Sequence, residues 1–300
     1  MGAWGVGLYS NDFALDLRST IAALVRLPFD ARKILEILCE TERHVAQDPQ
    51  DADHTTFWFV TADQFQKRGL HCPETAGRAL ALIDSGSDEV MHQKLGMSAN
   101  GLRKRSANLA KLRERLQCEA MPTRRKTLKR PQELIMAVGD IFAYPTSRGV
   151  SFNPYFHPSD RRYTWAQDAW GAMLVVDAGL AFGYLAWYRV MVAKYEFDNR
   201  PTVAMLARAP WTLRDAGTCS LTHFRRMALE LISKVVVNTE KLESAFGKLG
   251  TGDAAAVSDI SIGNHTGVVS KNPDTLRFVQ PSMERAHSLD LQEFTTESLH

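Results

Sequence analysis

Cys219 and His223 are the pair whose residue types and spacing come closest to nucleophilic catalysis. Cys219 stands where a helix is predicted to begin, and the partial positive charge of a helix N-terminus can lower the pKa of a thiol. His223 follows one turn later and could accept the thiol proton. A lone cysteine usually packs in a protein core, however, and we favour that interpretation.

The first sixteen residues hold a second group that could do chemistry. Gly2, Gly5 and Gly7 precede a predicted helix, and a glycine-rich turn before a helix N-terminus can bind phosphate. The spacing does not match GxGxxG, and Asp12 and Asp16 place negative charge where a phosphate needs positive charge. Phosphate binding is therefore the less favoured interpretation of these glycines.

Asp12 and Asp16 lie one helical turn apart and could pair as general acid and base. We favour a structural role, in which Asn11 and Asp12 cap the helix and offset its dipole while the glycines allow a tight chain path. The same structural role is expected for the whole motif, which consists of Trp4, Gly5, Gly7, Asn11, Asp12 and Asp16.

Histidine and aspartate side chains gather in one short segment that could hold a hard cation: His44, Asp48, Asp51, Asp53 and His54. The segment has no glycine at a required bend and no EF-hand spacing, so we favour a solvated acidic loop. The four cysteines are spread singly and form no CxxC motif, so no zinc site is indicated either. The sequence predicts neither a metal nor a cofactor.

Positive charge is concentrated in one segment of a chain whose net charge is only +2. Residues 101–130 contain eleven Lys or Arg and two Glu, so the segment carries +9 and the rest of the chain carries −7. Such a segment can bind a phosphate backbone or dock onto an acidic protein surface. It contains no aromatic residue on which a base could stack. The candidate binding residues are Arg103, Lys104, Arg105, Lys111, Arg113, Arg115, Arg124, Arg125 and Lys126.

Residues 155–165 form a second candidate interaction segment, which is both aromatic and basic. Arg161 and Arg162 can donate paired hydrogen bonds to a phosphate or a carboxylate, and the neighbouring rings offer contact area. Alternatively, the rings anchor a surface loop to its own domain. The rings in question are Tyr155, Phe156, Tyr163 and Trp165.

Helical periodicity dominates the sequence from Asn11 to Gln117. Caps and breakers predict helices from Asp12 to before Pro28, from Asp30 to before Asp48, from Thr55 or Thr56 to Gly69, and from Pro73 to Gly86. A turn is predicted over Ser87–Leu95. A long helix then starts at about Ser98, with Leu102, Leu109, Leu112 and Leu116 on its inward face.

The second half of the chain has the period and the composition of strands. Strands are predicted over Val138–Tyr144, Gly171–Val176 and Leu180–Ala193, with a hairpin turn at Asp177-Ala178-Gly179 between the last two. A helix over about Thr222–Ile232 and a strand over Lys234–Asn238 follow.

These elements predict an α+β protein in two parts, which suits a chain of 300 residues. A helical bundle is expected over residues 1–120, a basic linker over 121–132 and a β-rich domain, built as a small barrel or a bent sheet, over 133–250. Residues 251–300 have weak periodicity and are expected to be loosely ordered.

The N-terminal segment resembles the start of a bacterial family of uncharacterised proteins, domain of unknown function 4259. The shared pattern is Gly-x-Trp-Gly-x-Gly, an aromatic residue, Asn-Asp, then Ala and Asp. It is matched here by Trp4, Gly5, Gly7, Tyr9, Asn11, Asp12, Ala14 and Asp16. No activity is implied by this resemblance.

The eight residues Val138–Pro145 are similar to the opening strand of the immunity protein 26 family, which comprises predicted antidotes of polymorphic bacterial toxins. That resemblance implies a β-rich domain that neutralises a partner by binding it. We therefore expect a cytoplasmic bacterial protein without enzymatic activity that covers the surface of a protein partner, such as a toxin.

The alternative is an accessory protein of phage or plasmid defence that binds nucleic acid through the basic segment and Arg161-Arg162. No membrane association is expected. The most apolar stretch, Trp170–Tyr188, is interrupted by Asp177 and three glycines, so it is too polar to span a bilayer.

Overall fold

The computed structural model describes residues 5–118, 125–160, 165–194, 196–249, 253, 262–266, 288–291 and 295. The chain divides into two compact units, Met1–Lys129 and Arg130–His300, and the division falls inside the predicted linker. Most of the predicted loose C-terminal segment lies outside the described residues, as do Trp4, Arg124, Arg161 and Arg162.

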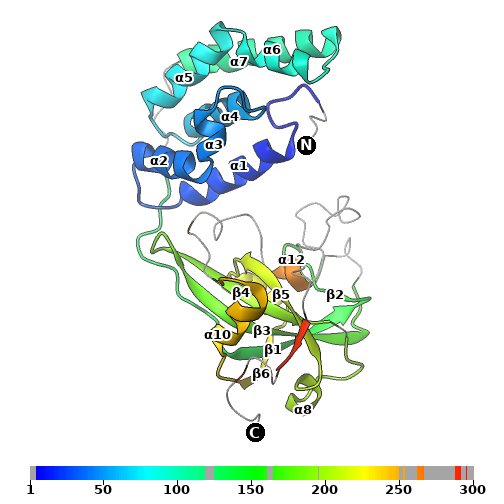
Figure 1. Cartoon of the computed structure of the whole chain (residues 1–300). Coiled ribbons are helices and arrows are strands. Elements are labelled where there is room, and N and C mark those ends of the chain that lie inside the picture. Colours follow the sequence, from blue (N-terminus) through cyan, green and yellow to red (C-terminus); the bar gives the residue numbers. More distant parts are fainter. Residues whose placement is uncertain are drawn as a thin grey trace. The chain divides into compact units, whose positions relative to one another are not determined.

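The first unit consists of helices, as the periodicity predicts (Figure 1). They are α1 (Asp12–Leu24), α2 (Ala31–Thr41), α3 (Arg43–Gln47), α4 (His54–Lys67), α5 (Pro73–Asp84), α6 (Ser87–Lys94) and α7 (Ala99–Gln117). Helix α4 is the centre of this unit: residues 54–65 are all buried, and α1, α3, α5 and α7 pack against it.

Three of the predicted helix starts are confirmed by side-chain caps. Asn11 Oδ1 accepts from the Ala14 amide at 2.7 Å at the start of α1, and Asp30 Oδ1 accepts from the Lys33 amide at 2.7 Å at the start of α2. Ser98 caps α7 through the Gly101 amide at 3.2 Å. These side chains satisfy backbone donors that a helix leaves unpaired, which explains why the sequence marks the starts well.

Two predictions for the helical unit are wrong. Residues 87–94 form helix α6 instead of a turn, with Asp88 in the first helical turn and Lys94 in the last, where the helix dipole favours them. The polar composition of this helix hides its period. The predicted second helix is broken at Glu42 into α2 and α3.

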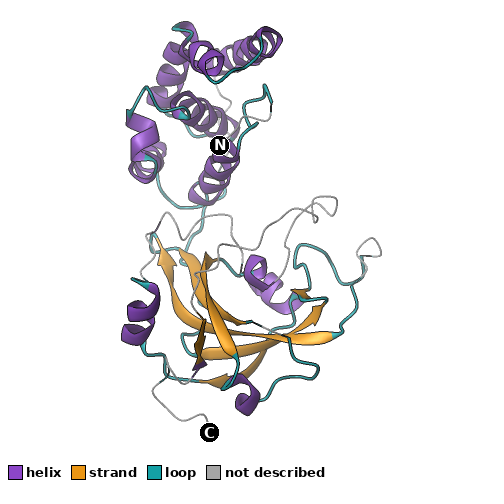
Figure 2. Ribbon diagram, turned by 45° about the vertical axis from the view of Figure 1, so that its right-hand side comes forward, coloured by secondary structure: helices purple, strands orange, loops and turns teal. Residues whose placement is uncertain are grey.

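The second unit is an antiparallel sheet that curls into a half-barrel, so the predicted α+β class is confirmed (Figure 2). Its strands follow the order β2-β1-β3-β4-β5-β7, and β6 also pairs with β1. They are β1 (Asp140–Ser147), β2 (Val150–Ser151), β3 (Ala169–Ala181), β4 (Leu185–Ala193), β5 (Pro210–Gly217), β6 (Glu230–Lys234) and β7 (Ser288–Asp290). The short helices are α8 (Val203–Leu206), α9 (Leu221–Arg226), α10 (Thr239–Phe246) and α12 (Gly263–Thr266).

Both faces of the central strands are buried. Leu174 and Met191 belong to a core on one face, while Met173 and Val190 belong to a core on the other face. Alternate residues of one strand therefore enter different cores, which explains why the strand sequences are almost continuously apolar.

The predicted hairpin turn at Asp177–Gly179 is wrong. Strand β3 continues to Ala181, and the turn lies at Phe182 and Gly183, whose φ angles of 52° and 73° are both positive. Positive φ at both central positions is typical of turns that follow the twist of a hairpin. Asp177 instead follows a β-bulge, where its carboxylate accepts from the Ala178 amide.

The predictions after residue 209 are partly wrong. Strand β5 was missed, because its charged and proline residues interrupt the strand pattern. Helix α9 ends at Arg226, and residues 230–232, assigned to that helix from the sequence, belong to strand β6. Of the predicted strand over Lys234–Asn238, only Lys234 lies in β6. Ala228 has a φ of 50°, which turns the chain away from a helical path. Within the described residues, no helix is long and apolar enough to cross a membrane.

Candidate functional site

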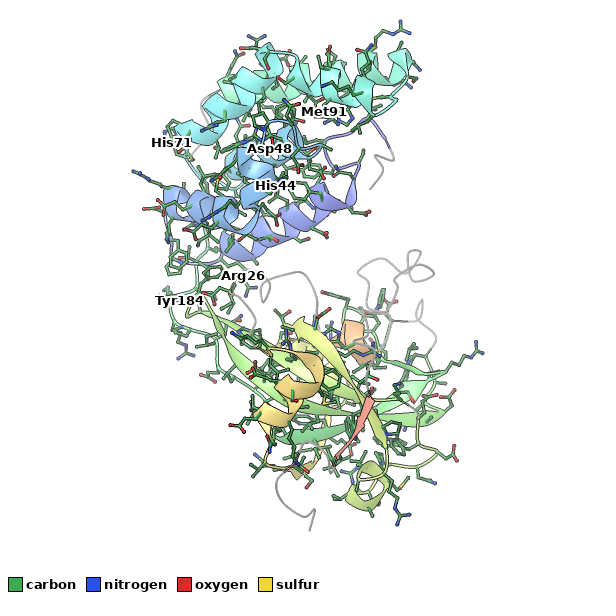
Figure 3. All side chains as sticks on the ribbon, in the orientation of Figure 1. Arg26, His44, Asp48, His71, Met91 and Tyr184 are labelled. Atoms are coloured by element: carbon green, nitrogen blue, oxygen red, sulfur yellow. The ribbon has the colours of Figure 1, made fainter. Side chains whose placement is uncertain are left out.

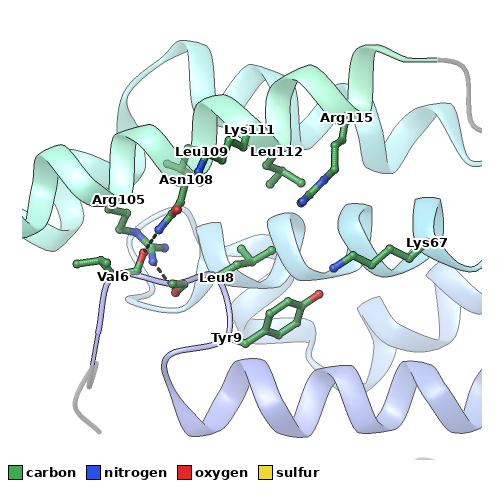
Figure 4. Close-up of a pocket in the computed structure, with 11 residues that line it drawn as sticks. Val6, Leu8, Tyr9, Lys67, Arg105, Asn108, Leu109, Lys111, Leu112 and Arg115 are labelled. Atoms are coloured by element: carbon green, nitrogen blue, oxygen red, sulfur yellow. Dashed lines mark hydrogen bonds between the residues drawn. The ribbon is translucent and has the colours of Figure 1, made fainter.

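The helical unit contains a pocket of about 220 Å³ between the loop that precedes α1, helix α4 and helix α7 (Figure 4). Apolar side chains and cations both contribute to its lining. The apolar residues are Val6, Leu8, Leu109 and Leu112, the cations are Lys67, Arg105, Lys111 and Arg115, and Gly7, Tyr9 and Asn108 complete it.

Helix α7 holds the loop that carries the glycine motif. Asn108 Nδ2 donates to the Val6 carbonyl at 3.1 Å, and Arg105 Nη1 donates to the Gly7 carbonyl at 3.3 Å. Figure 4 shows both side chains reaching from α7 to the loop. The Gly7 amide in turn donates to Ser10 Oγ at 3.0 Å. The part of the motif that is described therefore positions one wall of the pocket.

Asn11, Asp12 and Asp16 of the motif do not line the pocket. Asn11 caps α1 and also donates through Nδ2 to Asp53 at 2.9 Å. Asp12 and Asp16 are exposed on α1. Their positions agree with the structural role that we favoured over acid and base catalysis.

Asp63 is fully buried beneath the pocket and is surrounded by donors. Lys67 Nζ and Arg115 Nη2 each lie 2.6 Å from its carboxylate, and the Tyr9 hydroxyl donates to it as well. Burial raises the pKa of Tyr9, and the hydrogen bond to Asp63 raises it further. Tyr9 thus stays protonated at neutral pH and serves as a donor rather than as a base.

Asp88, in the first turn of α6, forms a second buried carboxylate site. Arg105 Nε and Nη2 bind it at 2.5 and 2.8 Å, and Thr55 Oγ1 donates to it at 2.8 Å. Burial lowers the pKa of the neighbouring His92, and Arg105 lowers it further. Arg105 is 4% exposed. Its assignment as a surface residue for a partner is therefore wrong, because its charge is used inside the unit.

The other candidate cations differ in their exposure and pairing. Arg113 forms an ion pair with Asp84 at 3.2 Å, and Arg125 donates to the carbonyls of Leu27 and Phe29. The rest are exposed and make no hydrogen bond or ion pair within the part of the chain that the structure describes: Arg103, Lys104, Lys111 and Lys126.

The candidate nucleophile is poorly placed for catalysis. Cys219 is buried, and burial raises its pKa to about 12. Ser220 caps α9 through the His223 amide at 3.1 Å, and the His223 ring packs edge-on against Tyr155. A thiol with this pKa is almost entirely protonated at neutral pH, so the packing interpretation is the better one.

The acidic segment of the helical unit does not form a common metal site. His44 lies 3.0 Å from Asp51 and 3.8 Å from Asp48, and Figure 3 shows His44 and Asp48 next to each other. The His54 ring instead bonds to the Val45 carbonyl at 2.7 Å. Among the described residues, no group of three or more His, Cys, Asp or Glu side chains could hold a metal ion.

The aromatic segment of the β-rich unit packs onto its own domain where it is described. Phe156 is buried, and Trp165 packs edge-on against Phe152 at a centroid distance of 5.6 Å. This agrees with rings that anchor a loop. Arg161, Arg162 and Tyr163 lie outside the described residues.

Sequence reasoning missed Asp63 and Lys67. A signal existed, because Asp63 lies among apolar residues of a helix and Lys67 follows four residues later, at the spacing of a helical ion pair. The participation of Tyr9 and Arg115 could not be seen, since it depends on tertiary contacts.

Comparisons with family models, with curated proteins and with solved structures found no match to this chain.

The two arginines at positions 103 and 105 provide a matched test of these roles. Arg105→Met leaves the Asp88 carboxylate buried without its partner, so we expect the helical unit to lose about 3–5 kcal/mol of stability. Arg103→Met removes an exposed cation and should change stability by less than about 0.5 kcal/mol. Urea denaturation followed by circular dichroism measures both; equal midpoints for the two variants would contradict the assignment.

The reactivity of Cys219 tests its packing role. With a pKa of about 12, only ~1 thiol in 10,000 is ionised at pH 8, so iodoacetamide should modify Cys219 far more slowly than the exposed Cys118. Peptide mass spectrometry of the folded protein, sampled over time, gives both rates. Modification of Cys219 as fast as Cys118 would show that the thiol is activated.

Proposed function

We propose that this protein acts by binding and not by catalysis, and that its target is an acidic surface of a partner protein. Toxin-immunity proteins act in this way, by covering their toxin. The observation that carries the proposal is the set of exposed cations on α7 that have no counter-ion among the described residues. The buried, protonated thiol of Cys219 supports the non-catalytic part.

The geometry of α7 supports a directed contact. Lys104, Lys111 and Arg115 are separated by seven and four residues, which places them on one side of the helix. Lys104 and Lys111 have no counter-ion among the described residues, whereas Arg115 also binds Asp63. All three project from a rigid helix that is anchored by the buried side chains of Leu109 and Leu112. Such an arrangement attracts an acidic surface and fixes its orientation.

Nucleic acid is the second candidate, because the same exposed cations fit a phosphate backbone. Tyr9 is the aromatic residue among those that line the pocket beside Lys111 and Arg115. Its ring already has Lys67 and Arg18 over it, at 5.4 and 5.5 Å from the centroid, so it offers a poor platform for a base. The observations therefore favour a protein partner.

Charge reversal separates these outcomes. In lysate of the source cell, the full chain is cross-linked and captured, and the variant Lys104→Glu/Lys111→Glu is compared with Arg32→Glu/Lys33→Glu, which reverses two exposed cations on α2. We expect the α7 variant to retain at least about tenfold less of one partner protein, and the α2 variant to retain it fully. Nuclease treatment should leave the capture unchanged.

Two results would contradict the proposal. Equal capture by both variants would remove α7 from the contact. The nucleic-acid hypothesis would be favoured instead if nuclease treatment abolished the capture and the purified chain bound DNA or RNA with an affinity that falls steeply with salt.

A further inference from the structure

We propose that the pocket beside α7 binds a carboxylate that is joined to a compact apolar group. This goes beyond the surface contact proposed above, since it assigns a ligand to the pocket itself, and either proposal can fail alone. The inference rests on the charge, the lining and the size of the pocket.

The pocket has more positive than negative charge. Four cations line it, and two carboxylates are bonded to three of these cations: Asp63 to Lys67 and Arg115, and Asp88 to Arg105. Four positive and two negative charges leave this group with a net charge of +2. Lys111 has no bonded partner there at all. An anion in the pocket would supply the missing charge, so the ligand is expected to be anionic.

The cations are held in place before a ligand arrives. Lys67 and Arg115 approach from α4 and α7 and share the buried carboxylate of Asp63, and Figure 4 shows both side chains reaching toward Tyr9. Because the side chains are already ordered, they lose little conformational entropy when an anion binds. Arg115 can also present its planar guanidinium to a carboxylate.

The apolar lining decides which anion fits best. Val6 and Leu8 are half-buried and supply accessible apolar surface from the loop, while Leu109 and Leu112 are buried and close the pocket on the α7 side. An inorganic phosphate would leave this surface in contact with water, whereas an alkyl or branched side chain would cover it. A volume of about 220 Å³ accommodates roughly seven to ten non-hydrogen atoms. A six-carbon carboxylate has this size.

Two sources could supply this chemistry: a free small carboxylate, or the C-terminal residue of a polypeptide that ends in an apolar side chain. In both ligands a carboxylate is joined to an alkyl group through a few bonds. Hexanoate is the probe for the first source. A hexapeptide that ends in leucine, with a free or an amidated C-terminus, is the probe for the second.

Isothermal titration calorimetry of the full chain tests the proposal. Hexanoate, or the free-acid peptide, should bind at least about tenfold more tightly than hexanol, acetate, inorganic phosphate and the amidated peptide. The tighter of the two binders identifies the source. Lys111→Gln should weaken that binding about fivefold or more, while Lys104→Gln, which removes an exposed cation that does not line the pocket, should leave it unchanged.

Four outcomes would overturn the proposal. Equal binding of hexanol and hexanoate would show that charge has no part, and equal binding of inorganic phosphate would show that the apolar lining has none. Absence of binding by both hexanoate and the free-acid peptide at 10 mM, roughly the weak limit of a specific site, would remove the pocket as a site. Equal weakening by Lys111→Gln and Lys104→Gln would place the binding elsewhere.

Discussion

The helical unit depends on the need of two buried carboxylates for positive partners. Asp63 and Asp88 are 0% and 1% exposed, and a carboxylate removed from water in this way is tolerated only when it is paired and hydrogen-bonded. Both find their partners on α7, where Arg105 and Arg115 are ten residues apart, or about 15 Å along the helix axis. These two contacts fix the rotation and the position of α7.

Once α7 is fixed, the roles of its other side chains follow. Leu109 and Leu112 enter the core, Asn108 and Arg105 hold the loop of the glycine motif, and Lys104 and Lys111 remain exposed. The same ion pairs therefore position the walls of the pocket, and they leave its lining with more positive than negative charge. The binding that we propose for this face requires no catalytic group. In the β-rich unit the candidate nucleophile, Cys219, packs in the core.

The sequence predicted those features that depend on neighbouring residues. The helix start at about Ser98 and the leucine stripe of α7 are local patterns. The start is confirmed, and of the stripe Leu109 and Leu112 are buried, while Leu102 and Leu116 are half-buried. The burial of Arg105 was missed, although it lies three or four residues from Leu102 and Leu109 and so shares their face. Its partner Asp88 stood in a segment predicted as a turn. The pairing of Tyr9 with Asp63 joins residues 54 positions apart, which no local pattern reveals.

Amide hydrogen exchange of the double variant Asp63→Asn/Asp88→Asn tests this account most directly, because it removes both charges and keeps the shapes of the side chains. We expect the amides of α7 to exchange at least about tenfold faster than in the wild type, while those of α2, which contacts neither carboxylate, keep their protection. Unchanged exchange throughout α7 would contradict the claim that the two buried carboxylates hold this helix.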